Sequence, residues 1–574
     1  MTSPAKTPGD VLRELNRASA GMVEQVFRDA PAGAGADVAA LMQVFTAADA
    51  QQIGKLRALE EAFYQEHFAL WSQMAAPSQA AAPESPGGDH RFEAAEWKLP
   101  FFRYVRQAYL VNARFLRGLG ELAQLEPAAR RRLQYQLRQM TDAMAPNNFP
   151  ATNPEVVRLA AESGGASLAQ GMKLLAADLA RGRISMSDEQ AFAVGRNLAV
   201  TPGSVVFENE VMQLIQYAPA TASVHEVPLL IVPPFINKYY ILDLRPENSF
   251  VRFCVEQGFS TFIVSWRNVP AQLGHLKWDD YIEQGVLAPL AAVRAISAAG
   301  KVNTLGFCVG GTLLACALAV LAARNESGRI ESVTLLATML DFAETGDISV
   351  YIDRDFVERT EQEFRQTGLM PGSKLANTFA MLRANDLIWH FIVSNYFKGQ
   401  PPRAFDLLYW NADGSNIPGR LYAWYLRNMY FENNLKIPRR LEALGAPLDL
   451  GAICAPAYIL ATREDHIVPW KSAYASTALL KGPCEFVLGA SGHVAGIVNP
   501  PAQKRRNFWI NASKAADADA WLADATQQAG SWWSHWASWL RARSGPLEPA
   551  AQPGSAQYPA IEAAPGRYVK EKSV

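Results

Sequence analysis

The chain has 574 residues, which is too long for one ordinary hydrophobic core and predicts at least two domains. Its 54 basic and 55 acidic residues nearly cancel, which excludes the strongly basic character of a nucleic-acid-binding protein. The five cysteines have neither paired nor metal-ligand spacing, so we expect free thiols in a reducing cytoplasmic setting, no metal and no cofactor.

The first third of the chain predicts helices and no strands. Apolar residues recur at helical spacing in four segments: 11–15, 38–45, 101–119 and 127–144. Residues 75–90, rich in Ala, Pro and Ser, predict a mobile linker inside an all-helical N-terminal domain over 1–190. The N-terminal residues lack the basic and apolar regions of a secretory signal. We also expect no transmembrane segment, because no apolar run is long enough to span a bilayer.

After about residue 190, short β-rich runs alternate with helical segments. The predicted strands are 204–207, 213–217, 228–232, 260–266, 301–305, 332–337, 456–461 and 485–488. Helices are predicted over 281–299 and 312–324, among others. Such alternation predicts a mostly parallel α/β sheet with its ligand site at the carboxyl ends of the strands.

Three later segments break this alternation within the second domain, 191–574. Residues 340–446, rich in aromatic residues and Asn, predict a cap inserted over the site. The Trp-dense segment 531–540 predicts a packed amphipathic helix. Residues 545–574, rich in Pro, Ala and Gly, predict a flexible tail.

The hexapeptide GFCVGG at 306–311 has the glycine spacing of a nucleophile elbow, with Cys308 where most such elbows carry serine. A predicted strand precedes it and an Ala/Leu-rich helix follows it. Glycine is needed two residues to either side of the nucleophile, because a Cβ there would clash across the turn. The sequence therefore predicts Cys308 as a nucleophile, with a buried structural cysteine as the alternative. Cys316, which lies in the helix without flanking glycines, fits that alternative.

A thiol nucleophile needs a base and an orienting acid, and both follow late strands in the order of the α/β-hydrolase fold. Asp465 follows the strand 456–461, and His493 follows the strand 485–488. Glu464 and His466 flank Asp465 and compete with it, but the position of Asp465 is favoured. The remaining histidines lie outside loops of this kind: His67, His90, His225, His275, His390 and His535.

An oxyanion hole in this fold uses the backbone N–H of the residue after the nucleophile, here Val309. The second donor is expected from the loop 233–238 after the third strand. Its two prolines have no N–H, so either Phe235 or Ile236 is the first available donor.

A cysteine nucleophile gains little over serine on an oxoester or amide. On a thioester it exchanges one thiol leaving group for another and keeps the acyl group activated for an alcohol acceptor. An aromatic cap would exclude water from that intermediate. From the residues alone, the chain is therefore an acyltransferase or a thioester hydrolase with an acyl-Cys308 intermediate.

Several segments closely resemble class I polyhydroxyalkanoate synthases over about 147–574. These segments are GFCVGG (306–311), PPFINKYYILDLRPENS (233–249), VSWRN (264–268), WDDYI (278–282), DLLYWNADGSNIPG (406–419), REDHIVPW (463–470), SGHVAGIVNPP (491–501) and APGRYVK (564–570). The resemblance implies that (R)-3-hydroxyacyl-CoA, such as 3-hydroxybutyryl-CoA, acylates Cys308 with His493 as base. The 3-hydroxyl of a further unit then attacks a thioester and lengthens the polyester, while Asp465 either orients His493 or assists that deprotonation.

The resemblance also implies partners and a location. It implies a homodimer, in which residues 408–416 are either a contact region or packing inside the cap. The helical domain would contact granule-associated proteins, at the surface of cytoplasmic polyester granules. We expect the tryptophans of 531–540 to pack in the protein rather than bind polymer.

Two rival functions remain. A thioesterase or polyester depolymerase could use the same triad with water as acceptor. A non-enzymatic granule coat or scaffold could retain the fold without activity, but the complete set of Cys, His and Asp argues against it.

Overall fold

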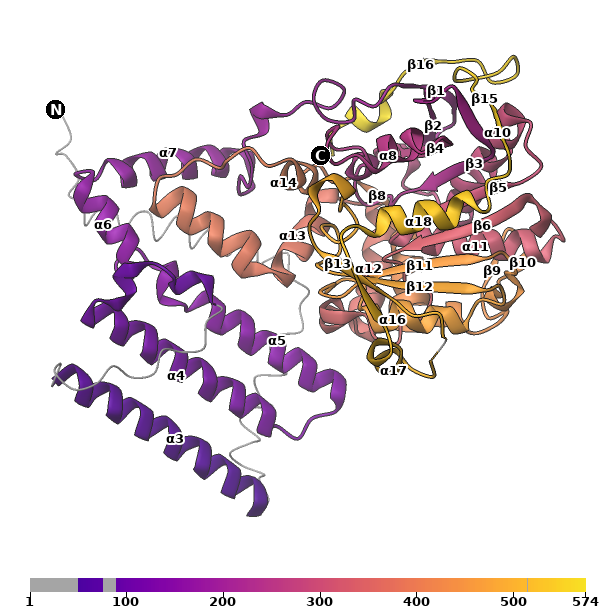
Figure 1. The fold of residues 1–574 in the computed structure, drawn as a ribbon. Helices are drawn as coiled ribbons and strands as arrows, with labels where there is room; N and C mark the ends of the chain where they lie inside the picture. The colour runs from indigo at the N-terminus through magenta and orange to yellow at the C-terminus, as the bar shows by residue number, and fades with distance from the viewer. Residues whose placement is uncertain (1–49, 76–88, 514, 574) are drawn as a thin grey trace. The chain divides into compact units, whose positions relative to one another are not determined.

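The computed structural model describes residues 50–75, 89–513 and 515–573. The chain divides into two compact units (Figure 1). One joins the residues up to Asp188 with Asn377–Ala404, and the other joins Glu189–Ala376 with Phe405–Val574. The predicted helical segments 11–15 and 38–45, and nearly all of the predicted linker, lie outside the described residues.

The first unit is helical. Its main helices are α3 (Ala50–Ala75), α4 (Pro100–Leu122), α5 (Pro127–Ala143), α6 (Pro154–Glu162) and α7 (Ala166–Arg181). Helix α3 packs on α4, and α4 packs on α5 (Figure 1). The predicted helices 101–119 and 127–144 correspond to α4 and α5 and are confirmed.

The segment Asn377–Ala404, which lies inside the predicted cap range 340–446, packs with this helical unit instead. The Tyr396 hydroxyl donates to the buried Asp178 carboxylate at 2.7 Å, and Ser185 N donates to the same carboxylate at 2.9 Å. The approach is so close that a Cβ on Gly171 would lie 1.8 Å from Tyr396 O. Contacts with a glycine and a buried carboxylate that are distant in sequence therefore determine where this segment packs. The composition of the segment itself does not indicate this packing.

The second unit contains a 12-stranded sheet with the order β14-β13-β12-β11-β6-β5-β3-β4-β2-β1-β16, in which β15 also pairs with β3. Strands β4, β3, β5, β6, β11 and β12 are parallel, and the strands toward both edges are antiparallel. The strands are β1 (Gly203–Glu208), β2 (Met212–Tyr217), β3 (Ser223–Val232), β4 (Phe259–Trp266), β5 (Val302–Phe307), β6 (Ile330–Leu336), β11 (Ala457–Thr462), β12 (Cys484–Gly489), β13 (Asn507–Ile510), β14 (Thr526–Ala529), β15 (Leu547–Pro549) and β16 (Glu562–Ala563).

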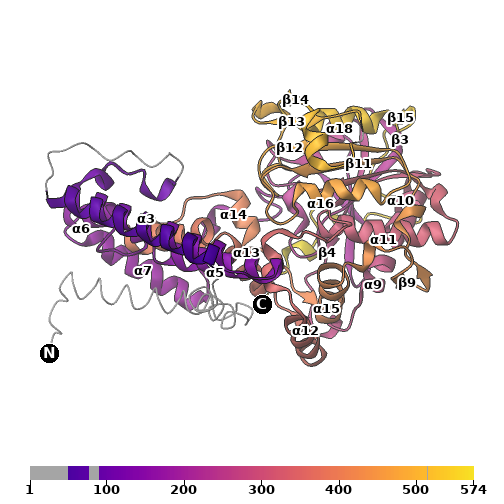
Figure 2. The ribbon, with the colours of Figure 1, turned by 90° about the horizontal axis from the view of Figure 1, so that it is seen from below.

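The eight strands predicted from the sequence are confirmed as β1 to β6, β11 and β12. The sheet helices are α8 (Phe250–Glu256), α9 (Trp278–Ile282), α10 (Ala288–Ser297), α11 (Val309–Ala323), α16 (Trp470–Ala475), α17 (Ala518–Ala523) and α18 (Trp532–Arg541). Figure 2 shows α18 on one face of the sheet and α10, α11 and α16 on the other. Parallel strands covered by helices on both faces are typical of α/β folds.

The parts of 340–446 that remain in this unit contain short elements. They are α12 (Arg354–Thr367), α13 (Gly372–Leu382, which continues into the helical unit), α14 (Asp406–Asn411), α15 (Gly419–Tyr425), and two small ribbons, β7 (Leu369–Met370) with β8 (Ile417–Pro418) and β9 (Glu442–Ala443) with β10 (Ala446–Pro447). A π-helical turn, Leu426–Phe431, continues α15. Turns of this kind are frequent at functional sites.

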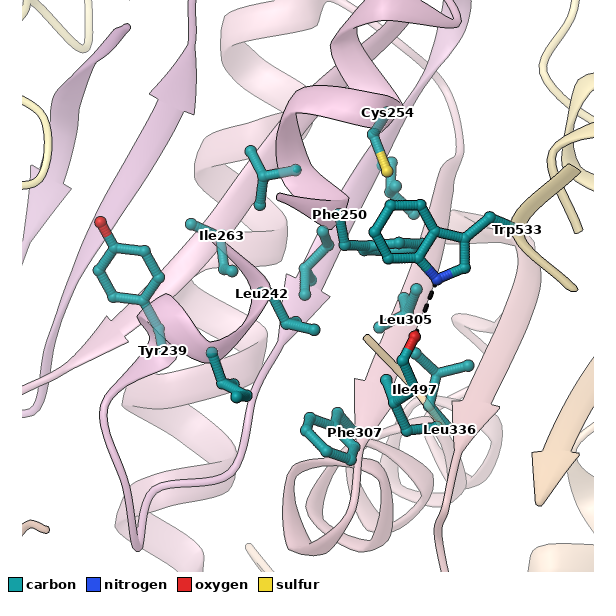
Figure 3. Close-up of a cluster of buried hydrophobic side chains, with 14 of the residues drawn as sticks. Tyr239, Leu242, Phe250, Cys254, Ile263, Leu305, Phe307, Leu336, Ile497 and Trp533 are labelled. Atoms are coloured by element: carbon teal, nitrogen blue, oxygen red, sulfur yellow. Dashed lines mark hydrogen bonds between the residues drawn. The ribbon is translucent and has the colours of Figure 1, made fainter. Parts of the chain in front are cut away.

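Helix α18 packs into the core of the sheet unit. Trp532, Trp533 and Trp536 are each at most 1% exposed. Trp533 packs on Phe250, and its indole N–H donates to Ile497 O at 2.8 Å (Figure 3). The prediction that these tryptophans pack in the protein is therefore confirmed.

The prediction of a flexible tail over 545–574 is wrong for the described residues. Strand β15 pairs antiparallel with β3, and β16 pairs antiparallel with β1. Further on, the backbone N–H groups of Arg567 and Tyr568 donate to the Gln213 side chain at 3.1 and 3.2 Å. This segment is ordered because it pairs with strands that are distant in sequence. Its Pro/Ala/Gly-rich composition does not indicate such pairing, so the sequence-based prediction missed it.

Within the described ranges, no helix is long and apolar enough to cross a membrane.

Candidate active site

Cys308 lies on a sharp turn between β5 and α11. Its backbone has φ 53° and ψ −128°, in the region that favours glycine. Its N–H donates to Leu336 O at 2.9 Å, which ties the turn to the neighbouring strand β6. A Cβ on Gly306 would lie 2.3 Å from Gly311 Cα, so the two arms of the turn meet as the elbow motif predicts.

The first turn of α11 packs directly on the loop after β3. A Cβ on Gly310 would lie 2.4 Å from Val232 O and 2.5 Å from Pro233 O. We call residues 233–238 the oxyanion loop. Because the first N–H groups of a helix have no intrahelical acceptor, the Val309 N–H is available where this loop meets the elbow.

The aromatic side chain of Phe235 anchors the oxyanion loop. It is 3% exposed and packs edge-on against the rings of Trp266, Trp278 and Tyr281. The Trp266 indole N–H also donates to Pro233 O at 2.8 Å. The loop therefore lies where the sequence places the second oxyanion donor, and the choice between Phe235 and Ile236 stays open.

Asp465 follows β11, and its buried carboxylate is saturated with hydrogen bonds. Its Oδ1 accepts from Ile467 N at 2.9 Å and Val468 N at 2.8 Å. Its Oδ2 accepts from Thr462 Oγ1 at 3.2 Å and contacts His493 Nδ1 at 2.6 Å. Four such contacts suit an ionised carboxylate, which only accepts hydrogen bonds. The carboxylate fixes the His493 tautomer with its proton on Nδ1.

His493 lies in the loop after β12 and is 8% exposed. Its ring stacks on Phe307, the residue before the nucleophile, with centroids 5.5 Å apart. Burial by itself lowers the pKa of His493, but the charges of Asp465 and Cys308 and the hydrogen bonds to both raise it well above its usual value. The site therefore favours the protonated, imidazolium form of His493.

The structure brings Cys308, His493 and Asp465 together, whereas the competing His466 is half-buried and the Glu464 side chain is exposed. His225 and His535 bond elsewhere, to Gly545 O at 3.2 Å and to the Tyr458 hydroxyl at 3.1 Å. Of the other four histidines predicted to lie outside the site, His90, His275 and His390 are exposed, and His67 is half-buried with its Nε2 3.3 Å from Asn112 Oδ1.

Cys316 is fully buried in α11, and burial raises the pKa of its thiol to about 12. It therefore stays protonated, as expected of a structural cysteine.

Two tyrosines near Cys308 were not predicted. Tyr425 ends α15, Tyr430 lies in the following π-helical turn, and their ring centroids are 5.5 Å apart. Burial raises the pKa of both hydroxyls, and the charge of Cys308 raises them further. Phe342 packs edge-on against both rings. Both hydroxyls therefore stay protonated and can donate near the nucleophile. The only sequence signal for these two tyrosines is the high aromatic content of the predicted cap, residues 340–446.

Comparisons with known proteins agree with this geometry. Residues 88–254 match the family model described as the poly-beta-hydroxybutyrate polymerase (PhaC) N-terminus, and residues 228–500 match the alpha/beta hydrolase fold. The poly(3-hydroxyalkanoate) polymerase subunit PhaC of Cupriavidus necator is 50% identical over 523 residues, covering 90% of this chain and 88% of that protein. The corresponding subunit of Rhizobium meliloti is 40% identical over 516 residues, covering 88% of this chain and 84% of that protein.

Poly(3-hydroxyalkanoate) polymerase 1 of Ectopseudomonas oleovorans is 39% identical over 519 residues and covers 90% of this chain and 92% of its own length. The similarity thus extends over nearly the whole of each protein, including the elbow and the loops of Asp465 and His493. With a cysteine elbow on an α/β-hydrolase fold and relatives of this extent, the chain belongs to the poly(3-hydroxyalkanoate) polymerase family.

Proposed function

We propose that the chain is an acyltransferase that polymerises (R)-3-hydroxyacyl-CoA, and first of all 3-hydroxybutyryl-CoA, into polyhydroxyalkanoate with release of CoA. The observation that carries the proposal is the buried His493–Asp465 contact of 2.6 Å next to the elbow cysteine. Membership of the polymerase family selects polymer formation over hydrolysis as the outcome.

In the acylation step, the thiolate of Cys308 attacks the thioester carbonyl of the substrate. The developing oxyanion accepts from Val309 N–H and from one N–H of the oxyanion loop. The carbon–sulfur bond to CoA breaks, and the leaving CoA thiolate takes the proton of the His493 imidazolium. The raised pKa of His493 keeps that proton available for the leaving group.

In the elongation step, His493 is neutral and its Nε2 accepts the proton of the 3-hydroxyl of a further unit. The hydroxyl oxygen attacks the acyl-Cys308 carbonyl, an ester forms, and the thiolate returns as leaving group. The bonding of Asp465 supports the role of orienting His493, because its Oδ1 already accepts from two backbone N–H groups. A role for Asp465 in deprotonating the hydroxyl is the alternative.

The aromatic groups around the site support transfer to an alcohol rather than to water. Tyr425, Tyr430 and Phe342 form a cluster of edge-on rings on the cap side of the nucleophile. Apolar walls lower the activity of water near an acyl-enzyme, which lengthens its lifetime. Hydroxyls that stay protonated can orient the substrate without accepting its proton.

The test is incubation of the purified protein with (R)-3-hydroxybutyryl-CoA, measuring CoA release together with polymer mass. We expect CoA release with a turbid, high-mass polyester. Free 3-hydroxybutyrate without polymer would instead support the thioesterase or depolymerase alternative. Cys308→Ala should abolish CoA release, whereas Cys454→Ala, at an exposed cysteine, should leave it unchanged. CoA release that persists in Cys308→Ala would contradict the nucleophile and favour the scaffold alternative.

We also propose a homodimer that acts at the surface of cytoplasmic polyester granules. Trp410, Asp413, Ser415 and Asn416 are buried within the sheet unit itself, which favours cap packing over dimer contact for the segment 408–416. Size-exclusion chromatography with light scattering tests the dimer. A mass of twice the chain mass is expected, and the mass of a single chain would contradict it.

Contact with granule-associated proteins is proposed through the helical unit. Helix α3 exposes Tyr64, Phe68 and Trp71, which recur at helical spacing on one face. Replacing Phe68 and Trp71 by serine should lower co-sedimentation with isolated granules, and unchanged co-sedimentation would contradict this role.

A further inference from the structure

The oxyanion loop is fixed through its own main-chain carbonyls. Ile236 O accepts from Ser415 N at 3.1 Å, and Lys238 O accepts from the Trp410 indole N–H at 2.7 Å. Trp410 belongs to α14, and Ser415 lies in the segment after it. These two bonds fix the carbonyls at the end of the loop, and they therefore constrain the peptide units that carry the candidate N–H donors.

Lys238 closes this loop with a buried ammonium group. The side chain is 2% exposed, and its Nζ donates to the main-chain O of Glu571 at 2.7 Å. Burial lowers the pKa of Lys238 to about 8, against the attraction of Asp413 and Glu571, while the charge of Lys572 lowers it further. A methionine would fill a similar space without this loss of hydration, so stability alone does not explain a lysine here.

The acceptor of the Lys238 ammonium belongs to a segment that is itself held in place. Lys572 O accepts from Asn268 Nδ2 at 2.8 Å, and Lys572 Nζ donates to Asp413 Oδ1 at 2.9 Å. The other oxygen of the Asp413 carboxylate accepts from the Tyr240 hydroxyl at 2.8 Å. The oxyanion loop, the segment after α14 and the C-terminal segment 568–572 thus form one closed network.

Two residues just after strand β4, Arg267 and Asn268, anchor this network on its other side. The Arg267 guanidinium lies over the Tyr568 ring at 5.0 Å and 3.9 Å from the Glu571 carboxylate. Asn268, the next residue, also accepts from Asn416 N at 2.9 Å. The C-terminal segment therefore rests on the parallel sheet and offers Lys238 a fixed acceptor.

We propose that Lys238 is a positioning residue for acyl transfer, and that the C-terminal segment 568–572 acts on catalysis through it. The ammonium clamps the oxyanion loop to Glu571 O, so that an N–H of Phe235 or Ile236 stays aimed at the oxyanion. In this role, Lys238 and the C-terminal segment act on the oxyanion loop and not on the substrate. This inference rests on the proposed acyl transfer at Cys308.

The first test is Lys238→Met, assayed for CoA release from (R)-3-hydroxybutyryl-CoA. We expect kcat to fall at least about tenfold while KM changes less than about twofold, because an oxyanion donor acts in the transition state and not on substrate binding. The thermal unfolding midpoint should stay close to that of the wild type, which a loss of fold would not allow. Lys301→Met is the matched control, since Lys301 is half-exposed, precedes β5 and pairs with Glu331.

The second test is a chain that ends at Lys570, which lacks both Glu571 and Lys572. It removes the acceptor instead of the donor, so we expect a similar fall in kcat. A chain that carries both changes should be no slower than the slower single variant, because both changes open the same clamp.

A folded Lys238→Met variant with kcat within about twofold of the wild type would overturn the inference, and so would losses that multiply in the combined variant. If Lys238→Met does not fold, the shortened chain decides by the same kcat criterion. A wild-type protein that releases no CoA would instead overturn the proposed function, so the two failures are distinguishable.

Discussion

Replacing Asp465 by asparagine should invert the tautomer of His493. Asp465 Oδ1 accepts from two backbone N–H groups, so the amide oxygen of an asparagine will face them and its NH2 group will face His493 Nδ1. An imidazole that accepts at Nδ1 carries its proton on Nε2 and cannot accept one from Cys308. The variant also loses the carboxylate charge that raises the pKa of His493.

The size of the effect follows from these two losses. Tautomer inversion in a comparable triad lowers turnover by about 10⁴-fold. A cysteine thiol is more acidic and more nucleophilic than the serine hydroxyl of that triad and depends less on its base, so we expect about 10³-fold, or about 4 kcal/mol in the barrier. Because His493 serves both steps, acylation and elongation should fall together.

The assay is rapid-quench measurement of CoA release in a single turnover, followed by steady-state polymer formation. Glu464→Gln is the matched control, since Glu464 is adjacent and exposed, and it should behave as the wild type. Acylation that falls less than about tenfold in Asp465→Asn while elongation is lost would refute the tautomer argument. Asp465 would then be the base for the hydroxyl.

Three further predictions concern the pH dependence, the unpredicted tyrosines and the core. The folded-state pKa of His493 is raised, so the stability it contributes is full below about pH 6.5 and is lost as the pH rises through the folded-state value. Urea midpoints of the wild type and His493→Gln should therefore differ most near about pH 6 and converge as the pH rises through the raised pKa of His493, and a constant difference would contradict this. Tyr430→Phe should slow acylation about tenfold in stopped-flow CoA release, because it removes one hydroxyl near Cys308. An unchanged rate would exclude that hydroxyl from the chemistry. Trp533→Ala should lower the free energy of urea unfolding by about 3–5 kcal/mol, since it leaves a cavity and removes one of the two hydrogen bonds to Ile497 O, and a loss below about 1 kcal/mol would contradict the packing argument.

The sequence predicts the parts of the site whose signals are local. The glycines around Cys308 define the elbow, because the turn itself requires them within five residues. Asp465 and His493 each follow a strand with clear β-pattern, and the loops at the ends of parallel strands meet at one edge of the sheet. The catalytic roles of these three residues stay predictions until the variants are measured.

Contacts between distant segments escape such signals. Lys238 lies in a segment resembling the synthases, yet its contact with Glu571 joins residues 333 positions apart. The C-terminal segment has no periodic pattern, and its order comes from strands β1 and β3. Tyr430 stands in a π-helical turn, which an aromatic-rich sequence does not distinguish from an ordinary helix.

The hydrogen bond between Tyr396 and Asp178 has a consequence for dissecting the protein. The helical unit is discontinuous in the chain, so removing residues up to Asp188 would not remove it cleanly. The segment Asn377–Ala404 would remain, with the Tyr396 hydroxyl deprived of its Asp178 acceptor and the surface that now faces Gly171 open to solvent. A truncated protein of that kind would tend to aggregate for reasons unrelated to its chemistry, so its activity would report on solubility as much as on the role of the helices.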